Sequence, residues 1–500
     1  MSRTGETLQS ERGPAGRTQS VNTLPQHRDL YYGGQWHRPS GGYLETINPA
    51  TGQNLGLTAQ ANVADVAAAV TSAQSAFLTW RQLPPRTRAA LLRKVADSLR
   101  AHAEELAFLD AVNCGNPIRP MVKDVQDGAD YIDYFAGLAT ELKGDITPMG
   151  DEVVNLTLRE PYGVCARILA FNHPLMFAAM KIGAPLAAGN TVILKPSPQA
   201  PLSAYRMMEV IEGIFPPGVL NMLSGGRECG EALCAHPGVP VITLVGSIES
   251  GRACARAAAD RLKRVMLELG GKNALIVYPD ADLDRAVDVA VRGMNFAWCG
   301  QSCGSTSRLF LHESIHDRVL AGVLAAIKQY KPGIPTEPET TMGAVISGAQ
   351  LARIRGYIAA GLAEGAQLVA GGQPPNDPRL AQGFFIEPTV FSGVEPNMRI
   401  AREEIFGPVL SVLKWREEAD MFAAVNAVDH GLTASICTSS LATAHRAMRR
   451  VEAGYVWINN AGPHYVGVPF GGYKQSGIGR EESIEELFAF SQAKNVNITL

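Results

Sequence analysis

The chain has 500 residues, 46% of them hydrophobic, so it can bury a large core without disulfide or metal staples. Its 45 basic and 48 acidic side chains give a formal net charge of −3, which argues against a nucleic-acid or anionic-membrane partner. No apolar run reaches the roughly 18 residues that span a bilayer. We therefore expect small molecules as partners, without nucleic acid or membrane.

Residues 1–28 are polar, rich in Ser, Thr, Gly and Arg, and lack the apolar run of a secretory signal. We predict a disordered tail; a transit peptide is the alternative, against which Glu6 and Glu11 count. The eight cysteines form no CxxC pair and no zinc-type cluster with histidine. This pattern predicts free thiols, no metal site and a cytoplasmic location.

The next elements follow in chain order. Tyr31–Trp36 and Thr46–Gly52 combine aromatic or extended residues with Gly and Asn-Pro turn signals, which predicts a short hairpin. From Asn62 to Leu106 apolar residues recur every three or four positions, which predicts two amphipathic helices. A third helix is predicted over Asp124–Leu142.

Beyond Gly163, short apolar runs such as VCARILAF, TVILKP, VITLVGS and ALIVYP alternate with helical stretches. Strand and helix in this alternation predict a parallel α/β sheet. A second series begins near Ala281, with helices at 283–298, 315–330 and 346–364 and strands at SRLFLH, FFIEPTVF, VLSVLKW and YVWIN. The sequence therefore predicts two α/β lobes.

Two segments could hold a phosphate-bearing ligand. In VITLVGSIESG, Gly246 and Ser247 end a strand and a helix begins near Gly251, so free backbone N–H groups could bind a pyrophosphate. Glycines at such turns are also common for purely structural reasons. Lys195 ends the strand TVILK, where ribose or phosphate could bind; plain solvent exposure is the alternative.

Two further side chains suggest covalent chemistry. Glu268 stands among apolar residues before Gly270 and Gly271, and burial would raise its pKa and suit it to act as a base. A glutamate that caps the turn, or is exposed at the strand edge, fits equally. Cys303 in GQSCGSTSR follows a helix end that could favour its thiolate, but an inert buried thiol fits too.

Seven segments occur together in order: FNHPL (171–175), AAGNTVILKPS (187–197), LVGSIESG (244–251), LELGGK (267–272), GQSC (300–303), EEIFGPV (403–409) and PFGGYKQSGIGRE (469–481). With them the chain resembles the NAD(P)-dependent aldehyde dehydrogenase superfamily from about Tyr31 to its C-terminus. The resemblance implies an α/β fold with a Rossmann-type cofactor domain (29–145 and 162–275), an α/β catalytic domain (276–470) and a small β oligomerisation arm (146–161 and 484–500).

The resemblance also implies the chemistry. Cys303 attacks an aldehyde to give a thiohemiacetal and then a thioester, which water activated by Glu268 hydrolyses to the acid. The amide of Asn172 and the backbone N–H of Cys303 form an oxyanion hole, whose fixed donors stabilise the developing charge. Lys181 and Glu481 match a pair proposed to relay protons behind the base.

Cofactor positions are carried over in the same way. The resemblance assigns Lys195 to the adenosine ribose, Ser247 to the pyrophosphate, Glu404 to the nicotinamide ribose and Phe406 to the nicotinamide ring, with Arg353 as a further ribose contact. The other implied positions are Ser197, Gly225, Gly246, Gly251 and Leu269. Pro198 stands where NAD-preferring members often carry a glutamate that binds the ribose hydroxyls. NAD is the expected cofactor, and NADP stays an alternative.

One departure from the family pattern concerns the substrate. Phe171 and His173 flank Asn172 in place of the more usual Trp and Phe. The positions implied to line the substrate pocket are His173, Phe177, Met180, Phe296, Ala297, Trp298, His464, Tyr465 and Phe470. These rings predict a bulky or aromatic aldehyde, with a polar or anionic group near His173 or His464. The alternative is that both histidines satisfy neighbouring backbone groups.

Several alternatives remain open at this stage. The thioester could pass to coenzyme A, although a water-activating Glu268 argues against that. The chain could also be a catalytically silent binding or structural protein on this scaffold. A homodimer or a homotetramer fits the arm equally well. Cys299, one helical turn before Cys303, could form an inactivating disulfide with it.

Overall fold

The computed structural model describes residues 24–499, so the tail predicted for residues 1–23 lies outside the described range. The rest of the predicted tail, residues 24–28, is packed against the protein. The His27 ring stacks on Trp36 with centroids 4.8 Å apart, and Arg28 Nη1 donates to the carbonyl of Leu55 at 2.5 Å. The prediction of disorder is therefore wrong for residues 24–28.

The first lobe is built on an eight-stranded sheet in the order β2-β1-β9-β8-β7-β10-β11-β21. Its central strands are parallel: β7 (Val164–Ile168), β8 (Thr191–Lys195), β9 (Leu220–Met222), β10 (Val241–Gly246) and β11 (Arg264–Leu269). The antiparallel edge strands are β1 (Leu30–Tyr32), β2 (Gln35–His37) and β21 (Gly477–Ile478). Strands β7 and β8 are buried throughout, as continuous apolar runs covered on both faces should be.

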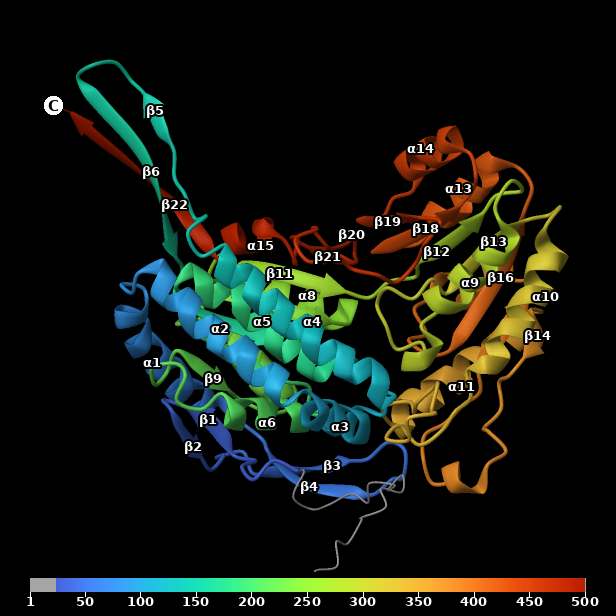
Figure 1. Cartoon of the computed structure of the whole chain (residues 1–500), viewed down its shortest axis with the longest axis horizontal. Helices are drawn as coiled ribbons and strands as arrows, with labels where there is room; N and C mark the ends of the chain where they lie inside the picture. The colour runs from blue at the N-terminus through green and yellow to red at the C-terminus, as the bar shows by residue number, and fades with distance from the viewer. Residues whose placement is uncertain (1–23, 500) are drawn as a thin grey trace, which may run out of the picture.

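Helices cover this sheet on both faces. They are α1 (Val63–Trp80), α2 (Pro85–Ala101), α3 (Ala103–Cys114), α4 (Ile118–Gly137), α5 (Pro174–Ala188), α6 (Leu202–Val210), α7 (Arg227–Ala235) and α8 (Ile248–Ala259). Figure 1 shows α2, α4 and α5 side by side in front of the sheet. The segment predicted to form two helices, residues 62–106, contains α1, α2 and the start of α3. The next predicted helix corresponds to α4, which begins before Asp124 and ends at Gly137.

The second lobe has a seven-stranded sheet in the order β14-β15-β16-β13-β12-β18-β19. These strands are β12 (Ala274–Val277), β13 (Arg308–His312), β14 (Gln367–Ala370), β15 (Thr389–Ser392), β16 (Val409–Trp415), β18 (Thr433–Cys437) and β19 (Tyr455–Ile458). Its helices are α9 (Leu283–Gly293), α10 (His316–Ala326), α11 (Gly348–Ala363), α12 (Arg399–Arg402), α13 (Glu418–Asn426) and α14 (Leu441–Arg450), and short 3-10 turns are η2 (Phe296–Trp298), η3 (Ile327–Gln329) and η4 (Pro378–Leu380).

The boundary between the lobes differs from the predicted one after residue 275. That position falls inside β12, which pairs with β13 and β18 of the second sheet. The chain therefore crosses between the lobes at residues 270–273, directly after β11. Strands β11 and β12 are both apolar and close in sequence, which predicts that they are neighbours in one sheet. Composition alone therefore could not locate the crossing.

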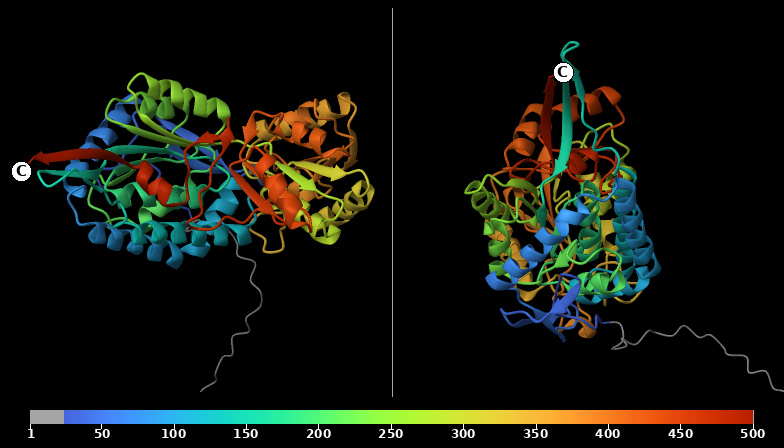
Figure 2. Two further views of the ribbon diagram at one scale, coloured as in Figure 1. Left: turned by 90° about the horizontal axis from the view of Figure 1, so that it is seen from above. Right: turned by 90° about the vertical axis from the view of Figure 1, so that its left-hand side faces the viewer.

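A three-stranded arm projects from the first lobe on the side away from the second lobe (Figures 1 and 2). It consists of β5 (Ile146–Pro148), β6 (Val153–Pro161) and β22 (Ser491–Thr499), with β6 in the centre. The start of the predicted C-terminal arm segment is different: α15 (Ile484–Ala489) packs against α5. Only the stretch from Ser491 extends the arm.

Two short ladders complete the structure. The predicted hairpin signals correspond to the turn between β1 and β2 and to the pair β3 (Tyr43–Ile47) and β4 (Asn54–Ala59). Strands β17 (His430–Gly431) and β20 (Tyr473–Lys474) pair with each other. Within residues 24–499, no helix combines the length and the apolar character needed to cross a membrane.

Candidate active site

The carboxyl ends of the first lobe's parallel strands bring the predicted site residues to one edge of the sheet. Asn172 follows β7, Lys195 ends β8, Ser247 follows β10 and Glu268 is the penultimate residue of β11. The strand order reverses between β7 and β10, because the chain runs from β7 to β8 and β9 on one side and then returns to β10 on the other. Open α/β sheets bind ligands at such a switch point.

Cys303 lies in the loop between η2 and β13 and is half-buried. It packs against a cluster from the second lobe formed by Leu432, Tyr455, Trp457 and Phe470. Burial, together with the charge of Glu268 and a hydrogen bond to its carboxylate, raises the pKa of the Cys303 thiol well above its usual value. Of the two readings of Cys303 left open by the sequence, these surroundings do not favour the thiolate, and a base must take the thiol proton before the sulfur can attack.

Glu268 is the carboxylate beside this thiol. It is 5% exposed, and its Oε1 has no hydrogen-bond partner within residues 24–499. Desolvation raises its pKa to about 8, although the hydrogen bond from Cys303 acts in the opposite direction. The readings in which Glu268 is an exposed edge residue or a turn cap are excluded, and a buried base remains.

Asn172 is 3% exposed in the loop between β7 and α5. Its backbone carbonyl accepts a hydrogen bond from Asn116 Nδ2 at 2.8 Å, and the adjacent Phe171 ring contacts Phe406 edge-on at 5.7 Å. Neither the Asn172 amide group nor the Cys303 backbone N–H has a hydrogen-bond partner in the described part of the chain. Both donors predicted for the oxyanion hole are therefore available.

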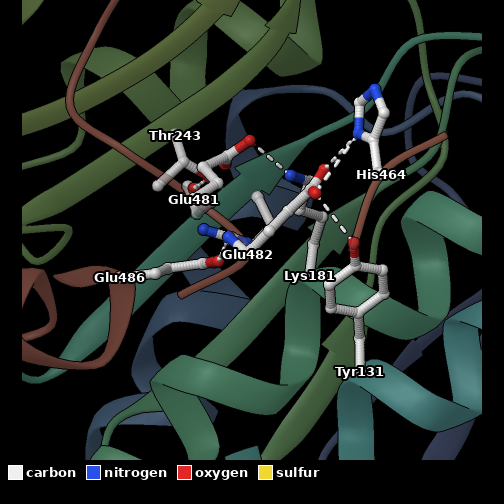
Figure 3. Close-up of polar contacts among 9 residues, drawn as sticks. Tyr131, Lys181, Thr243, His464, Glu481, Glu482 and Glu486 are labelled. Carbon is white, nitrogen blue, oxygen red and sulfur yellow. Dashed lines mark hydrogen bonds and ion pairs between the residues drawn. The ribbon is translucent and has the colours of Figure 1, made fainter. Parts of the chain in front are cut away.

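A buried ionic network includes Lys181 and Glu481 (Figure 3), whose charges act on the Glu268 carboxylate. Lys181 Nζ and Glu481 form a hydrogen-bonded ion pair, and both side chains are almost fully buried. Desolvation acts to lower the pKa of Lys181, but Glu481 and Glu486 outweigh it and the pKa is raised. The predicted relay pair is thus in direct contact, with its lysine charged.

The same network contains residues that sequence reasoning missed. Arg167 Nη2 donates to Glu486 at 2.9 Å, and Glu482 accepts from the Tyr131 hydroxyl at 2.7 Å and from His464 Nδ1 at 3.2 Å. All three charged groups are buried. The acidic run EESIEE was visible in the sequence, but such a run is usually exposed, and nothing local indicates that these glutamates are buried.

The first-lobe cofactor positions fit a dinucleotide. Lys195 is 5% exposed with a single long contact, 3.5 Å, to the carbonyl of Pro196, and desolvation lowers its pKa. Ser247 caps α8 by accepting from Ser250 N at 3.2 Å. A barely partnered buried amine and the free N-terminus of a twelve-residue helix suit ribose hydroxyls and a pyrophosphate. Ser197, Gly225 and Gly246 lie at the same sheet edge, after β8, after β9 and at the end of β10.

Close backbone packing supports this reading. A Cβ atom at Gly251 would lie 2.6 Å from Leu269 Cδ1, so glycine lets α8 approach β11. A Cβ atom at Gly270 would lie 2.1 Å from Glu404 Oε2, which shows how closely that carboxylate covers the turn. These contacts fix the helix N-terminus and one carboxylate of the second lobe at the same sheet edge.

The second lobe contributes the remaining cofactor positions. Glu404 accepts from the backbone N–H of Gly271 at 3.0 Å, and burial raises its pKa to about 7. Arg353 Nη2 donates to the Glu404 carbonyl at 2.8 Å. Phe406 adopts a left-handed backbone with φ of +55°, and its carbonyl accepts from Gln350 Nε2 at 2.8 Å. The structure thus brings both lobes together at the predicted site.

The predicted substrate residues fall into two aromatic groups. His173 contacts Phe177 and Trp298, each with ring centroids 5.5 Å apart. His464 contacts Phe470 at 4.3 Å, within the cluster that packs against Cys303. Aromatic rings therefore lie beside the residue that follows Asn172 and beside the Cys303 thiol.

In both histidines, the Nδ1 atom pairs with a carboxylate and not with a backbone group. His173 Nδ1 pairs with Asp124 Oδ2 at 2.7 Å, and His464 Nδ1 pairs with the Glu482 carboxylate. The alternative in which both histidines satisfy neighbouring backbone groups is therefore wrong. Sequence reasoning missed Asp124, which lies on α4, 49 positions before His173.

Other predicted positions lie elsewhere. Phe296 is fully buried in the second-lobe core against Tyr330, so its assignment to the substrate pocket is wrong. Met180 is buried in the first-lobe core, and Tyr465 is 56% exposed. The thiol of Cys299 donates to the carbonyl of Gly343, in a different core cluster from the one that Cys303 contacts. The structure therefore does not assemble a Cys299–Cys303 pair.

Comparisons with known proteins show the family that the chain matches. The model of the aldehyde dehydrogenase family matches residues 36–496. Aldehyde dehydrogenase tropH of Talaromyces stipitatus is 50% identical over 485 residues, which cover 95% of this chain and 94% of that protein.

Solved structures match over nearly the whole chain. The NAD+ complex of an aldehyde dehydrogenase from Bacillus cereus is 35% identical with a TM-score of 0.93, and the match covers 97% of this chain and 99% of that one. The P. syringae indole-3-acetaldehyde dehydrogenase AldA, solved with NAD+ and IAA, is 37% identical with a TM-score of 0.93, over 96% and 98% of the two chains. The α/β fold is therefore the fold of these enzymes.

Proposed function

The chain belongs to the aldehyde dehydrogenase family and is an NAD-dependent enzyme, and we propose that it oxidises an aldehyde to the carboxylic acid through a covalent intermediate on Cys303. The observation that carries this proposal is the position of the Cys303 thiol beside the buried carboxylate of Glu268, whose Oε1 has no hydrogen-bond partner within residues 24–499. A thiol with its own base is an activated nucleophile.

In the first step Glu268 takes the thiol proton and Cys303 Sγ attacks the aldehyde carbon. The carbonyl oxygen becomes an oxyanion, which the Asn172 amide and the Cys303 backbone N–H bind as hydrogen-bond donors. One such fixed donor is worth roughly 3 kcal/mol in the transition state. Asn172 donates without changing its own charge.

Lys195, Ser247 and Glu404 would hold the dinucleotide at the sheet edge, where its nicotinamide would supply the acceptor for the hydride from the aldehyde carbon. Glu268 passes the thiol proton on through the Lys181–Glu481 pair and is a carboxylate again before hydrolysis begins. It then removes a proton from water, which hydrolyses the thioester on Cys303 and releases the acid. The buried Lys181–Glu481 pair, whose charges act on Glu268, can pass that proton on as well.

The test is NADH formation with an aldehyde, combined with identification of the product. We expect a burst of NADH and release of the carboxylic acid, both abolished in Cys303→Ala. Unchanged turnover in Cys303→Ala would refute the covalent mechanism. Addition of coenzyme A distinguishes hydrolysis from acyl transfer. Formation of acyl-CoA in place of the acid would show that the thioester passes to coenzyme A and is not hydrolysed by water that Glu268 activates.

We further propose a bulky or aromatic aldehyde as substrate. The rings of Phe177, Trp298 and Phe470 around the Asn172 loop and Cys303 support it. The AldA relative, named for indole-3-acetaldehyde, is an aromatic-aldehyde enzyme. A higher kcat/KM for substituted benzaldehydes than for acetaldehyde is the expected result, and equal values would refute the idea.

The same assays with NADP address the proline at position 198. NAD is the cofactor that we propose for the cell. A ratio near one between kcat/KM for NAD and kcat/KM for NADP would show that Pro198 relaxes the selectivity between the two cofactors. We also propose that the enzyme acts in the cytoplasm, since all eight cysteines are free thiols, and that it assembles as a homodimer or homotetramer through the arm.

A further inference from the structure

The pair of His173 and Asp124 has no role in the chemistry above. His173 precedes the first turn of α5, Asp124 lies on α4, and Nδ1 and Oδ2 are 2.7 Å apart. The Asp124 side chain is 6% exposed and the His173 side chain is 16% exposed. A buried carboxylate therefore fixes the orientation of a partly accessible imidazole that directly follows Asn172 in the chain.

The second ring nitrogen of His173 is available. Within residues 24–499, Nε2 has no hydrogen-bond partner, while Phe177 and Trp298 flank the ring with centroids 5.5 Å away. The indole Nε1 of Trp298 also lacks an acceptor. The ring thus presents one polar atom within an apolar, aromatic wall.

The charges around this nitrogen indicate which group suits it. Desolvation acts to lower the pKa of His173, but Asp124 outweighs it, with smaller contributions from Asp110 on α3 and Asp127 on α4, and the pKa is raised. These carboxyl groups disfavour a free anion beside the ring. A hydroxyl group is compatible with either protonation state, since it accepts from an imidazolium N–H and donates to a neutral Nε2.

We infer that His173, oriented by Asp124, binds a hydroxyl group of the substrate, so that hydroxylated aromatic aldehydes are the preferred class. This inference rests on the proposed function and specifies its substrate. The flat ring of the aldehyde would lie against Phe177 and Trp298, and the aldehyde group would lie at the neighbouring Asn172.

The test compares benzaldehyde with its three hydroxy isomers and three methoxy isomers, with NAD. We expect the best hydroxy isomer to exceed benzaldehyde in kcat/KM by about tenfold or more, because a site built to bind a hydroxyl penalises an analogue that lacks it. The methoxy isomers accept but cannot donate. An advantage that persists in the matching methoxy isomer shows that His173 donates, and its loss shows that His173 accepts.

The decisive variant is His173→Phe, which keeps a ring but removes the nitrogens. The hydroxyl advantage, measured as the ratio of kcat/KM for the hydroxy isomer to kcat/KM for benzaldehyde in the same variant, should fall to less than twofold. Because this change leaves Asp124 without its partner, Asp124→Asn combined with His173→Phe gives a second version without a buried unpaired charge. His173→Gln, which can still donate and accept, should restore part of the advantage.

Three outcomes would overturn the inference: equal kcat/KM for benzaldehyde and all hydroxy isomers, an advantage that survives in both Phe variants, or an advantage lost in His464→Phe but retained in His173→Phe. The benzaldehyde rate separates this failure from that of the proposed function. If no aldehyde yields NADH, the dehydrogenase proposal fails; if benzaldehyde is oxidised but hydroxyls make no difference, only the role of His173 fails.

Discussion

At the scale of single residues, the contact between Cys303 and Glu268 determines how the rate should depend on pH. Burial raises the pKa of Glu268 to about 8, so below that pH the carboxyl group is mostly protonated and cannot accept a proton from water. Thioester hydrolysis needs the carboxylate form. Its rate should therefore rise with pH up to about 8 and then level off.

The measurement is the steady phase after the NADH burst, followed from pH 6 to pH 9. Glu268→Gln should slow this phase by about 10²- to 10⁴-fold, the usual contribution of a general base, and should remove the rise with pH. The NADH burst should slow as well, because Glu268 also takes the Cys303 thiol proton. An unchanged pH profile in Glu268→Gln would show that another group activates the water.

Lys272 carries a second prediction at this scale. It is 1% exposed, its Nζ has no hydrogen-bond partner in the described chain, and desolvation together with Arg308 lowers its pKa to about 7. An unpaired buried amine costs stability. We expect Lys272→Met, which keeps the volume without the amine, to raise the Tm of the cofactor-free enzyme by a few degrees at pH 7.

The gain should depend on pH. Between the folded pKa near 7 and the ordinary value of 10.5, the unfolded chain binds a proton that the folded chain does not, so wild-type stability rises with pH in this window. The advantage of Lys272→Met should therefore shrink from pH 7 towards pH 10. Lys94→Met, at an exposed position of α2, is the control and should change Tm little. A lower Tm for Lys272→Met would contradict the prediction.

The family motifs indicated Cys303, Glu268 and Asn172 together as candidate catalytic residues, and the structure places Glu268 beside Cys303. Sequence reasoning could not find the partner of His173, since Asp124 reaches that ring only through the packing of α4 on α5. It also placed Phe296 in the substrate pocket, whereas the side chain turns into the second-lobe core. Side-chain direction in a short 3-10 turn is set by tertiary packing, which local sequence does not encode.

At the scale of elements, the approach of α8 to β11 positions the predicted pyrophosphate site. Valine at position 251 would place Cβ 2.6 Å from Leu269 Cδ1, so the buried leucine or the helix must move. A shift of the helix N-terminus weakens its contacts with a bound dinucleotide. We expect Gly251→Val to raise the KM for NAD about tenfold, with a smaller effect on kcat.

Gly137→Val is the matched control for this change. Gly137 ends α4, is exposed, and has no heavy atom within 4 Å of a built Cβ. The KM for NAD should stay close to the wild-type value in that variant. An unchanged KM in Gly251→Val would show that the helix N-terminus does not bind the cofactor.

Element prediction succeeded where apolar runs stand between turn signals, as for β7, β8 and β10. It overestimated the strand FFIEPTVF, of which only the part from Thr389 joins the sheet, because Pro388 has no N–H to donate to a ladder. It also divided residues 62–106 into two helices. A break at His102 separates α2 from α3, and no proline or glycine marks it.

At the scale of the whole molecule, the alternation of strand and helix predicted the two lobes but not their relative placement. The site depends on that placement, because Glu268 comes from the first sheet whereas Cys303, Glu404 and Phe406 come from the second lobe. Contacts such as Glu404 with Gly271 join groups 133 positions apart. Such pairings follow from the assembled fold, and only the family motifs indicated them in advance.

The three-stranded arm of β5, β6 and β22 has the surface expected of an assembly contact. It exposes apolar side chains far from the body of the protein, with Ile146 76%, Leu158 43% and Ile498 44% exposed. Its outer strands β5 and β22 also leave backbone groups unpaired at the sheet edges. Apolar side chains and open strand edges on one projection favour burial against a second copy of the chain.

We therefore expect wild-type protein to behave as a dimer or tetramer in size-exclusion chromatography with light scattering. Replacing Ile146 and Leu158 together by glutamate should lower the molar mass, because charges would have to be buried at the contact. Leu441→Glu is the control, since Leu441 is 85% exposed at the start of α14 on the second lobe. If the wild-type chain is monomeric, or if the arm variant keeps the wild-type mass, the arm does not mediate assembly and its apolar side chains need another partner.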